Sequence, residues 1–244
     1  LAAPWLWGPR VSGLSFPQHL GEALIQVYWL LLFMAFWKVR ERIMDINEAT
    51  AGNRVIISVN VVGGVRRDLS PQQCRWILNE LNIVESEIRG LMSTMLNDYT
   101  VRERTVGKGI LSAEMALKLG AVGPTLRGSG VAQDARQLGY DAFPCLDFAP
   151  VTAPDGDSYS RAKVRFLETL QSLDLVRQAI GKLPEGELAA KVKGNPEGET
   201  TDRTEQPRGE VLYYVKGDGT KYLPRVRIRT PTFANIMPLL AMLP

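Results

Sequence analysis

The chain has 244 residues, of which 45% are hydrophobic and 23% charged, a composition typical of globular proteins. Its net charge of +3, without lysines and arginines clustered among aromatic residues, argues against a nucleic-acid partner. The two cysteines, Cys74 and Cys145, form no CxxC pair, and His19 is the only histidine. The composition therefore excludes a disulfide framework and a Cys/His metal site built from these residues alone.

Six prolines and glycines among residues 1–21 predict an irregular N-terminal segment. A helix is expected from Glu22, because the run Ala23–Trp37 is apolar apart from Gln26. This run is shorter than the ~20 residues of a membrane span, so it favours a buried core helix. Such a helix is apolar nearly all round and needs cover on every side, for which a partner subunit is one candidate.

Two long helices dominate the middle of the chain. The first begins where Ser70 can cap it, with Pro71 at its first position, and extends to about Asn97. The second covers about Ser158–Leu183, and helix capping explains Asp155-Gly156-Asp157 better than calcium binding does. Both repeat apolar residues at alternating steps of three and four, which predicts a helical bundle domain over residues 22–183, with one short strand near 55–62.

Residues 184–206 are rich in Gly, Pro, Glu and Lys and are interpreted as a linker or an exposed excursion. The alternating runs Glu210–Lys216 and Arg225–Arg229 then flank Gly217-Asp218-Gly219, which predicts a β-hairpin within residues 207–244, followed by an apolar C-terminal segment. A hairpin brings its ends together, so Arg208 and Thr232 are expected to form one wall of a site. The alternative is an ordinary edge hairpin with a solvated arginine. The expected fold is α+β and predominantly helical.

Four separated stretches together resemble a known family. They are AGNRVIISVNVVGGVRRDL, LRGSGVAQDARQLGYDAF, DGDSYSRAKVRFLETLQSLDLVRQAI and QPRGEVLYYVKGDGTK with RVRIRTPTFAN. They are similar to the catalytic large subunit of membrane-associated, energy-converting nickel–iron hydrogenases and to the D subunit of complex I, the NADH–quinone oxidoreductase. The resemblance implies an oxidoreductase subunit for electron transfer in a respiratory or hydrogenase complex. It also implies a peripheral position on the cytoplasmic face of the membrane, beside an iron–sulfur small subunit and membrane subunits.

The resemblance also implies roles for particular residues. Arg208, after Pro207, matches the family's arginine that overhangs the nickel–iron centre. Thr232 matches a hydroxyl residue that hydrogen-bonds a diatomic ligand of the iron, and Asn235 matches an asparagine a few residues further on. A guanidinium suits such a place because it is permanently charged, planar and weakly hydrated.

The chain departs from the hydrogenase pattern at the metal ligands. In that family two CxxC pairs hold nickel and iron through soft thiolates, and neither pair is present here. We therefore expect an internal fragment or truncated relative that cannot bind the nickel–iron centre and is inactive alone. Two alternatives remain open: a quinone-binding subunit of the complex I D type, and a non-catalytic scaffold for iron–sulfur and membrane subunits.

Overall fold

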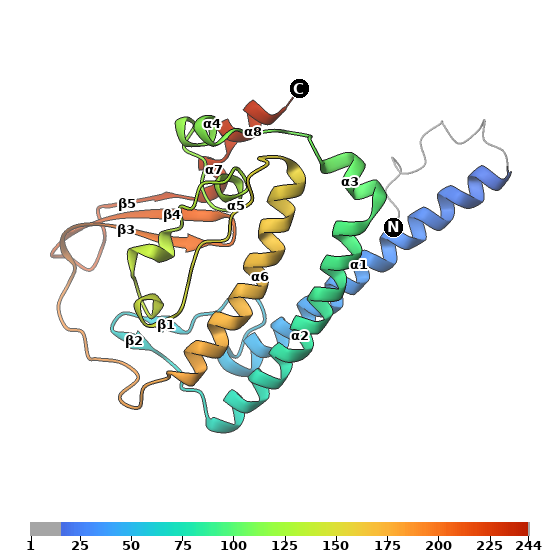
Figure 1. Cartoon of the computed structure of the whole chain (residues 1–244). Helices are drawn as coiled ribbons and strands as arrows, with labels where there is room; N and C mark the ends of the chain where they lie inside the picture. Colours follow the sequence, from blue (N-terminus) through green and yellow to red (C-terminus); the bar gives the residue numbers. More distant parts are fainter. Residues whose placement is uncertain (1–15, 244) are drawn as a thin grey trace.

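The computed structural model describes residues 16–243, apart from the side chains of residues 16–23 and 26. Long helices lie on one side of the molecule and a three-stranded sheet on the other, with short helices between them (Figure 1). The predicted α+β, helix-dominated fold is confirmed.

Helix α1 spans Phe16–Ala51 and so begins earlier than expected. The prediction of irregular structure is wrong for residues 16–21, because Pro17 falls in the first turn, where proline is tolerated; the same prediction for residues 1–15 lies outside the described part of the chain. The apolar half of α1 is not a buried core helix: Leu31 and Phe33 are 63% and 57% exposed. Among residues 16–243, no helix combines the length and apolarity needed to cross a bilayer.

Helix α2, Pro71–Asn97, begins as predicted. The Ser70 hydroxyl accepts from the Gln73 backbone N–H at 3.2 Å, and the Gln73 side chain accepts from the Ser70 backbone N–H at 2.9 Å. This reciprocal pair satisfies two backbone donors that a helix start leaves open. The predicted apolar stripe faces inward along the helix, with its buried members at Ile77, Leu81, Val84 and Ile88.

Helix α6, Ser158–Gly181, completes the bundle. Leu173 of α6 and Val39 of α1 pack with the α2 stripe in one core cluster. Asp157 caps α6, accepting from the backbone N–H of Ser160 at 2.7 Å and of Gly107 at 2.8 Å. The predicted capping role of this aspartate is confirmed, and the second bond also ties the distant segment around Gly107 to the start of α6.

Short elements connect the long helices. The strand predicted over residues 55–62 is wrong in extent, since only β1, Asn60–Val61, pairs with β2, Gly64–Val65. Val55 and Ile56 are exposed, and their backbone N–H groups donate to the side-chain oxygen of Asn53 at 2.9 and 3.0 Å instead of to a strand. The remaining short helices are α3 Tyr99–Thr105, α4 Ala113–Lys118, α5 Pro124–Arg127, η3 Ala135–Leu138 and η4 Phe143–Cys145.

The second sheet is antiparallel with strand order β3-β4-β5. β4, Gly209–Asp218, pairs with β5, Arg225–Arg229, which confirms the predicted hairpin. The predicted turn is wrong in position, because Gly217 and Asp218 extend β4 and pair with the strand on its other side, so the connection covers residues 219–224. Residues 197–206, expected as part of a linker, instead form β3, Glu197–Gln206, paired along its whole length with β4. Helices α7, Pro231–Ala234, and α8, Ile236–Met242, follow β5 and return the chain toward the start of α6 (Figure 1).

Candidate functional site

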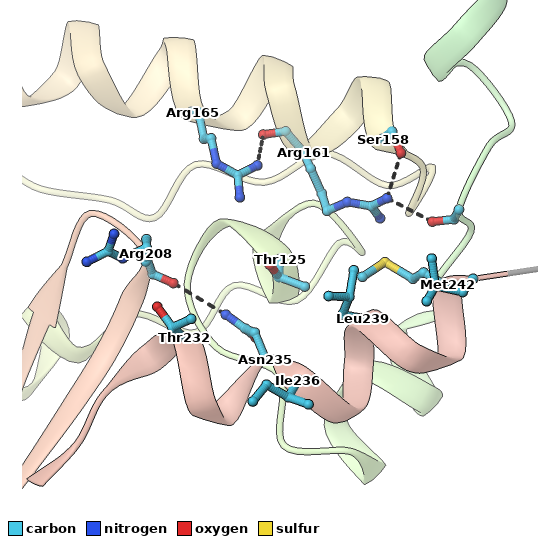
Figure 2. Close-up of a pocket in the computed structure, with 12 residues that line it drawn as sticks. Thr125, Ser158, Arg161, Arg165, Arg208, Thr232, Asn235, Ile236, Leu239 and Met242 are labelled. Carbon is cyan, nitrogen blue, oxygen red and sulfur yellow. Dashed lines mark hydrogen bonds between the residues drawn. The ribbon is translucent and has the colours of Figure 1, made fainter. Parts of the chain in front are cut away.

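A cavity of about 490 Å³ lies between the base of the sheet, α6 and the two C-terminal helices (Figure 2). Its polar lining comes from Thr125, Ser158, Arg161, Arg165, Arg208, Thr232 and Asn235, and its apolar lining from Ile236, Leu239, Met242 and Leu243. The cationic side chains therefore come from the base of the sheet and from α6, and the apolar side chains come from the C-terminal segment. Such a cavity suits a ligand that has both polar oxygens and an apolar body.

The structure brings the predicted pair together on this cavity. Arg208, between β3 and β4, and Thr232, in α7, lie side by side and line the same space (Figure 2). Both are exposed, so the cavity is open on this side, and Pro207 is exposed beside them without lining it. The chemical roles assigned to Arg208 and Thr232 stay predictions, although the juxtaposition expected from the hairpin is present.

Asn235 connects three backbone segments at the cavity. Its side-chain carbonyl accepts from the Val122 N–H at 3.0 Å, and its amide donates to the Val122 carbonyl at 3.2 Å and to the Arg208 carbonyl at 3.4 Å. These bonds occupy both ends of the amide side chain. Asn235 therefore lines the cavity, and its hydrogen bonds also hold the Arg208 backbone in place.

Two glycines allow the backbone on this side to approach closely. Gly123, at the start of α5, has φ +67° and ψ −147°, and Gly209 has φ +126°. A Cβ at Gly123 would lie 2.4 Å from the Cα of Gly209 and 2.6 Å from the carbonyl oxygen of Arg208. Only glycine takes these backbone angles readily, so the contact between α5 and Arg208 depends on residues without side chains.

Arginines of α6 form the opposite wall, as Figure 2 shows. Arg161 is only 8% exposed and donates to the Gly156 and Gly109 carbonyls, both at 2.8 Å, and to the Ser158 hydroxyl at 2.9 Å. Burial, followed by the nearby charge of Arg165, lowers the pKa of Arg161. Within residues 16–243, none of the three arginines Arg161, Arg165 and Arg208 forms an ion pair. The cavity is consequently a region of positive potential.

Sequence reasoning missed both α6 arginines. Ser158, Arg161 and Arg165 are spaced by three and four residues, which places them on one face of a helix. That spacing could have placed them together, but it could not have told a cavity-facing arginine from a solvated one.

The residues present do not fit a thiolate-held nickel–iron centre. Cys74 is half-buried in α2, Cys145 is exposed at the end of η4, and neither lines the cavity. Among the described residues there is no group of three or more His, Cys, Asp or Glu side chains suited to a metal ion. Nickel and iron in low oxidation states need soft, anionic donors, which this cavity lacks.

A buried charge cluster behind the cavity was also missed. Arg127, 1% exposed, uses different nitrogens for different carboxylates: Nε to Glu168 at 2.5 Å, Nη1 to Asp134 at 2.9 Å and Nη2 to Glu205 at 3.0 Å. Arg136 pairs with Asp134 at 2.7 Å. Three carboxylates thus share two guanidinium groups, so the cluster carries one excess negative charge.

The members of this cluster titrate differently. Burial would raise the pKa of Asp134, but its hydrogen bonds with Arg136 and the charge of Arg127 outweigh that and hold it below the ordinary value. Burial raises the pKa of Glu205, and the charge of Arg127 offsets this rise only in part. Glu205 therefore accepts a proton more readily than Asp134 does.

Comparison with protein families matches residues 29–195 and 189–244 to the family described as the respiratory-chain NADH dehydrogenase, 49 kDa subunit. The chain belongs to this family. The relationship predicted from the four sequence stretches is confirmed, and it covers the bundle from residue 29 onward, the sheet and every residue that lines the cavity.

Relatives within the 49 kDa subunit family are named for different activities. The membrane-bound hydrogenase subunit alpha of Pyrococcus furiosus is 39% identical over 220 residues, covering 82% of this chain and 51% of the relative. A D-type subunit of the NADH-quinone oxidoreductase of Anaeromyxobacter is 41% identical over 206 residues, covering 80% of this chain and 54% of the relative. The chain thus spans about half the length of these relatives, and their identities do not separate the hydrogenase branch from the quinone branch.

A solved structure shares the same fold. A chain of the membrane-bound sulfane sulfur reductase, an archaeal respiratory membrane complex, superposes with a TM-score of 0.78 at 29% identity, covering 84% of this chain and 58% of that one. The relatives named here are subunits of membrane oxidoreductase complexes that differ in the reaction they carry out.

Proposed function

We propose that this chain forms the body of the large subunit of a membrane-associated oxidoreductase of the hydrogenase type. In that complex the chain forms part of the wall of the site at which protons are reduced to hydrogen or hydrogen is oxidised. The observation that carries the proposal is the cavity, where Arg208 and Thr232 lie across from Arg161. A permanently charged guanidinium at a partly enclosed site can stabilise developing negative charge, which is the electrostatic part of redox catalysis that we assign to these residues.

The relatives are subunits of membrane complexes, which supports a proposal for how the chain sits in its own complex. We place the chain as a peripheral subunit on the cytoplasmic face of the membrane, against an iron–sulfur small subunit and membrane subunits. Because no CxxC pair is present in the 244 residues, we propose that the isolated chain binds no nickel–iron centre and turns over no hydrogen. Elemental analysis of the purified chain checks this, and stoichiometric nickel would refute it.

A quinone reaction is the second candidate. It is favoured by the apolar wall formed by Ile236, Leu239, Met242 and Leu243, which suits a prenylated or alkylated ring better than it suits a metal centre. A quinone headgroup would place its oxygens toward the arginines. Under this hypothesis the chain needs no thiolate ligands of its own.

One pair of variants separates these hypotheses in membranes that contain the intact complex. Arg208→Gln removes an exposed cation of the cavity, and Arg227→Gln removes an exposed arginine of β5 that does not line it. Loss of one such electrostatic donor typically costs about 10²-fold or more in rate. We expect this loss for hydrogen uptake and evolution in Arg208→Gln and near-normal rates in Arg227→Gln.

The other outcomes decide between the alternatives. If reduction of decylubiquinone falls in Arg208→Gln while hydrogen turnover is unchanged, the quinone function replaces the hydrogenase function. If neither activity changes while the complex assembles normally, the chain is a scaffold.

A further inference from the structure

The buried cluster behind the cavity connects its two cationic walls. Glu205, near the end of β3, lies three residues before Arg208, and Glu168 lies three residues after Arg165 on α6. Arg127 binds both carboxylates, through Nη2 and Nε respectively. A single guanidinium therefore links the strand that leads into one wall to the helix that carries the other.

The helix that carries Arg127 also touches the cavity directly. α5 begins at the close contact between Gly123 and the Arg208–Gly209 backbone, and it ends at Arg127. Thr125, between them, lines the cavity. This four-residue helix thus contacts the Arg208 backbone at its N-terminal end, through Gly123. At its C-terminal end, Arg127 binds β3, the strand that leads to Arg208.

An arginine at position 127 fits a geometric role better than a purely stabilising one. Replacing a buried ion network with apolar side chains of similar volume is often neutral or favourable for stability, so stability alone does not account for Arg127 and its three carboxylates. What arginine supplies is a rigid, planar set of N–H groups, which can fix three separate acceptors at once. Lysine has one nitrogen and cannot hold the same three positions.

We infer that Arg127 is a positioning residue that sets the spacing between the Arg208 wall and the α6 wall through Glu205 and Glu168. Its importance for activity rests on the proposed function of the cavity, whereas its effect on the spacing does not. Asp134 orients the guanidinium from the loop before η3, and it belongs to neither wall.

Distance measurement by pulsed electron paramagnetic resonance tests the spacing without ligand or turnover. Spin labels are placed at Lys163 of α6 and Asp202 of β3, both exposed, after both native cysteines have been replaced by serine. Glu168→Gln and Glu205→Gln cut the same connection at opposite ends. We therefore expect each variant to broaden the distance distribution, and the double variant to broaden it no further than either one.

Two more variants complete the test. Arg127→Lys should reproduce the broadening of the double variant, and Asp134→Asn, a matched loss of one buried charge, should lower thermal stability without broadening the distribution. Additive effects of Glu168→Gln and Glu205→Gln, or an unchanged distribution in folded Arg127→Lys, would overturn the inference. Should Arg127→Lys fail to fold, the two milder glutamine variants decide the matter alone.

Activity in the intact complex separates this inference from the proposed function. Misplacing a wall by a fraction of an ångström to an ångström should reduce turnover about tenfold or more in Glu205→Gln. If the distances broaden while neither Arg208→Gln nor Glu205→Gln affects turnover, the spacing role stands and the function proposed for the cavity fails.

Discussion

Replacing Gly123 with alanine should be among the most damaging single changes in this chain. The backbone angles of Gly123 belong to a region populated essentially by glycine, and holding another residue there costs about 1–3 kcal/mol. The new Cβ would also lie 2.4 Å from the Cα of Gly209, where neither backbone can move aside without disturbing the sheet, and overpacking of this kind costs about 1–3 kcal/mol more. We expect Gly123→Ala to lose about 4 kcal/mol of unfolding free energy in total.

Gly120→Ala is the matched control. Gly120 has φ +68°, close to that of Gly123, but a Cβ there would meet no atom within 4 Å. Only the left-handed backbone is penalised, at about 1–2 kcal/mol. Urea unfolding followed by tryptophan fluorescence measures both, and a lower midpoint at an unchanged slope would show a true loss of stability. Equal losses in the two variants would refute the close contact between α5 and Arg208.

Three further predictions concern other parts of the chain. Asp157→Ala should cost about 1–2 kcal/mol at pH 7 through the lost cap. Burial raises the pKa of Asp157, but hydrogen bonds from the Ser160 and Gly107 amides outweigh burial and hold the pKa below its ordinary value. The stabilisation by this carboxylate is therefore present above about pH 4 and disappears as the pH falls further. A stability difference between Asp157→Ala and the unmodified chain that persists at pH 2 would contradict the capping role. Ser70→Ala should cost about 1 kcal/mol in thermal unfolding, whereas an unchanged melting temperature would mean that the capping box contributes nothing. The exposed apolar side chains of residues 24–37 should make the isolated chain associate at micromolar concentration, and a monodisperse monomer in sedimentation would show otherwise.

The elements that were predicted correctly carry local signals. Ser70-Pro71 and an uninterrupted apolar stripe indicate α2, and alternation around a Gly-Asp-Gly turn indicates the β4–β5 hairpin. β3 has no apolar residue at all, so its sequence resembles a linker. It becomes a strand because β4 offers it a complete row of hydrogen-bond partners, a tertiary effect that no local pattern contains.

The same limit applies to the site. Arg208 and Thr232 could be paired from the sequence because a hairpin joins them, and the family resemblance added their proposed roles. Arg127 and Arg161 could not be found in this way. The sequence does not reveal that Arg127 will be enclosed by three carboxylates from three different segments, or that Arg161 will be buried beside backbone carbonyls.

The polar character of β3 has a consequence for how the molecule meets other chains. β3 is an edge strand, and its sequence, EGETTDRTEQ, offers charges and hydroxyls along the whole free border. Adding a foreign strand there would require water to be stripped from those groups, which protects this edge of the sheet against edge-to-edge aggregation. Exposed apolar side chains lie elsewhere, at Leu31 of α1, at Leu240 of α8 and at Ile228 of the opposite edge strand β5, so a chain waiting for assembly should associate through those surfaces rather than through β3.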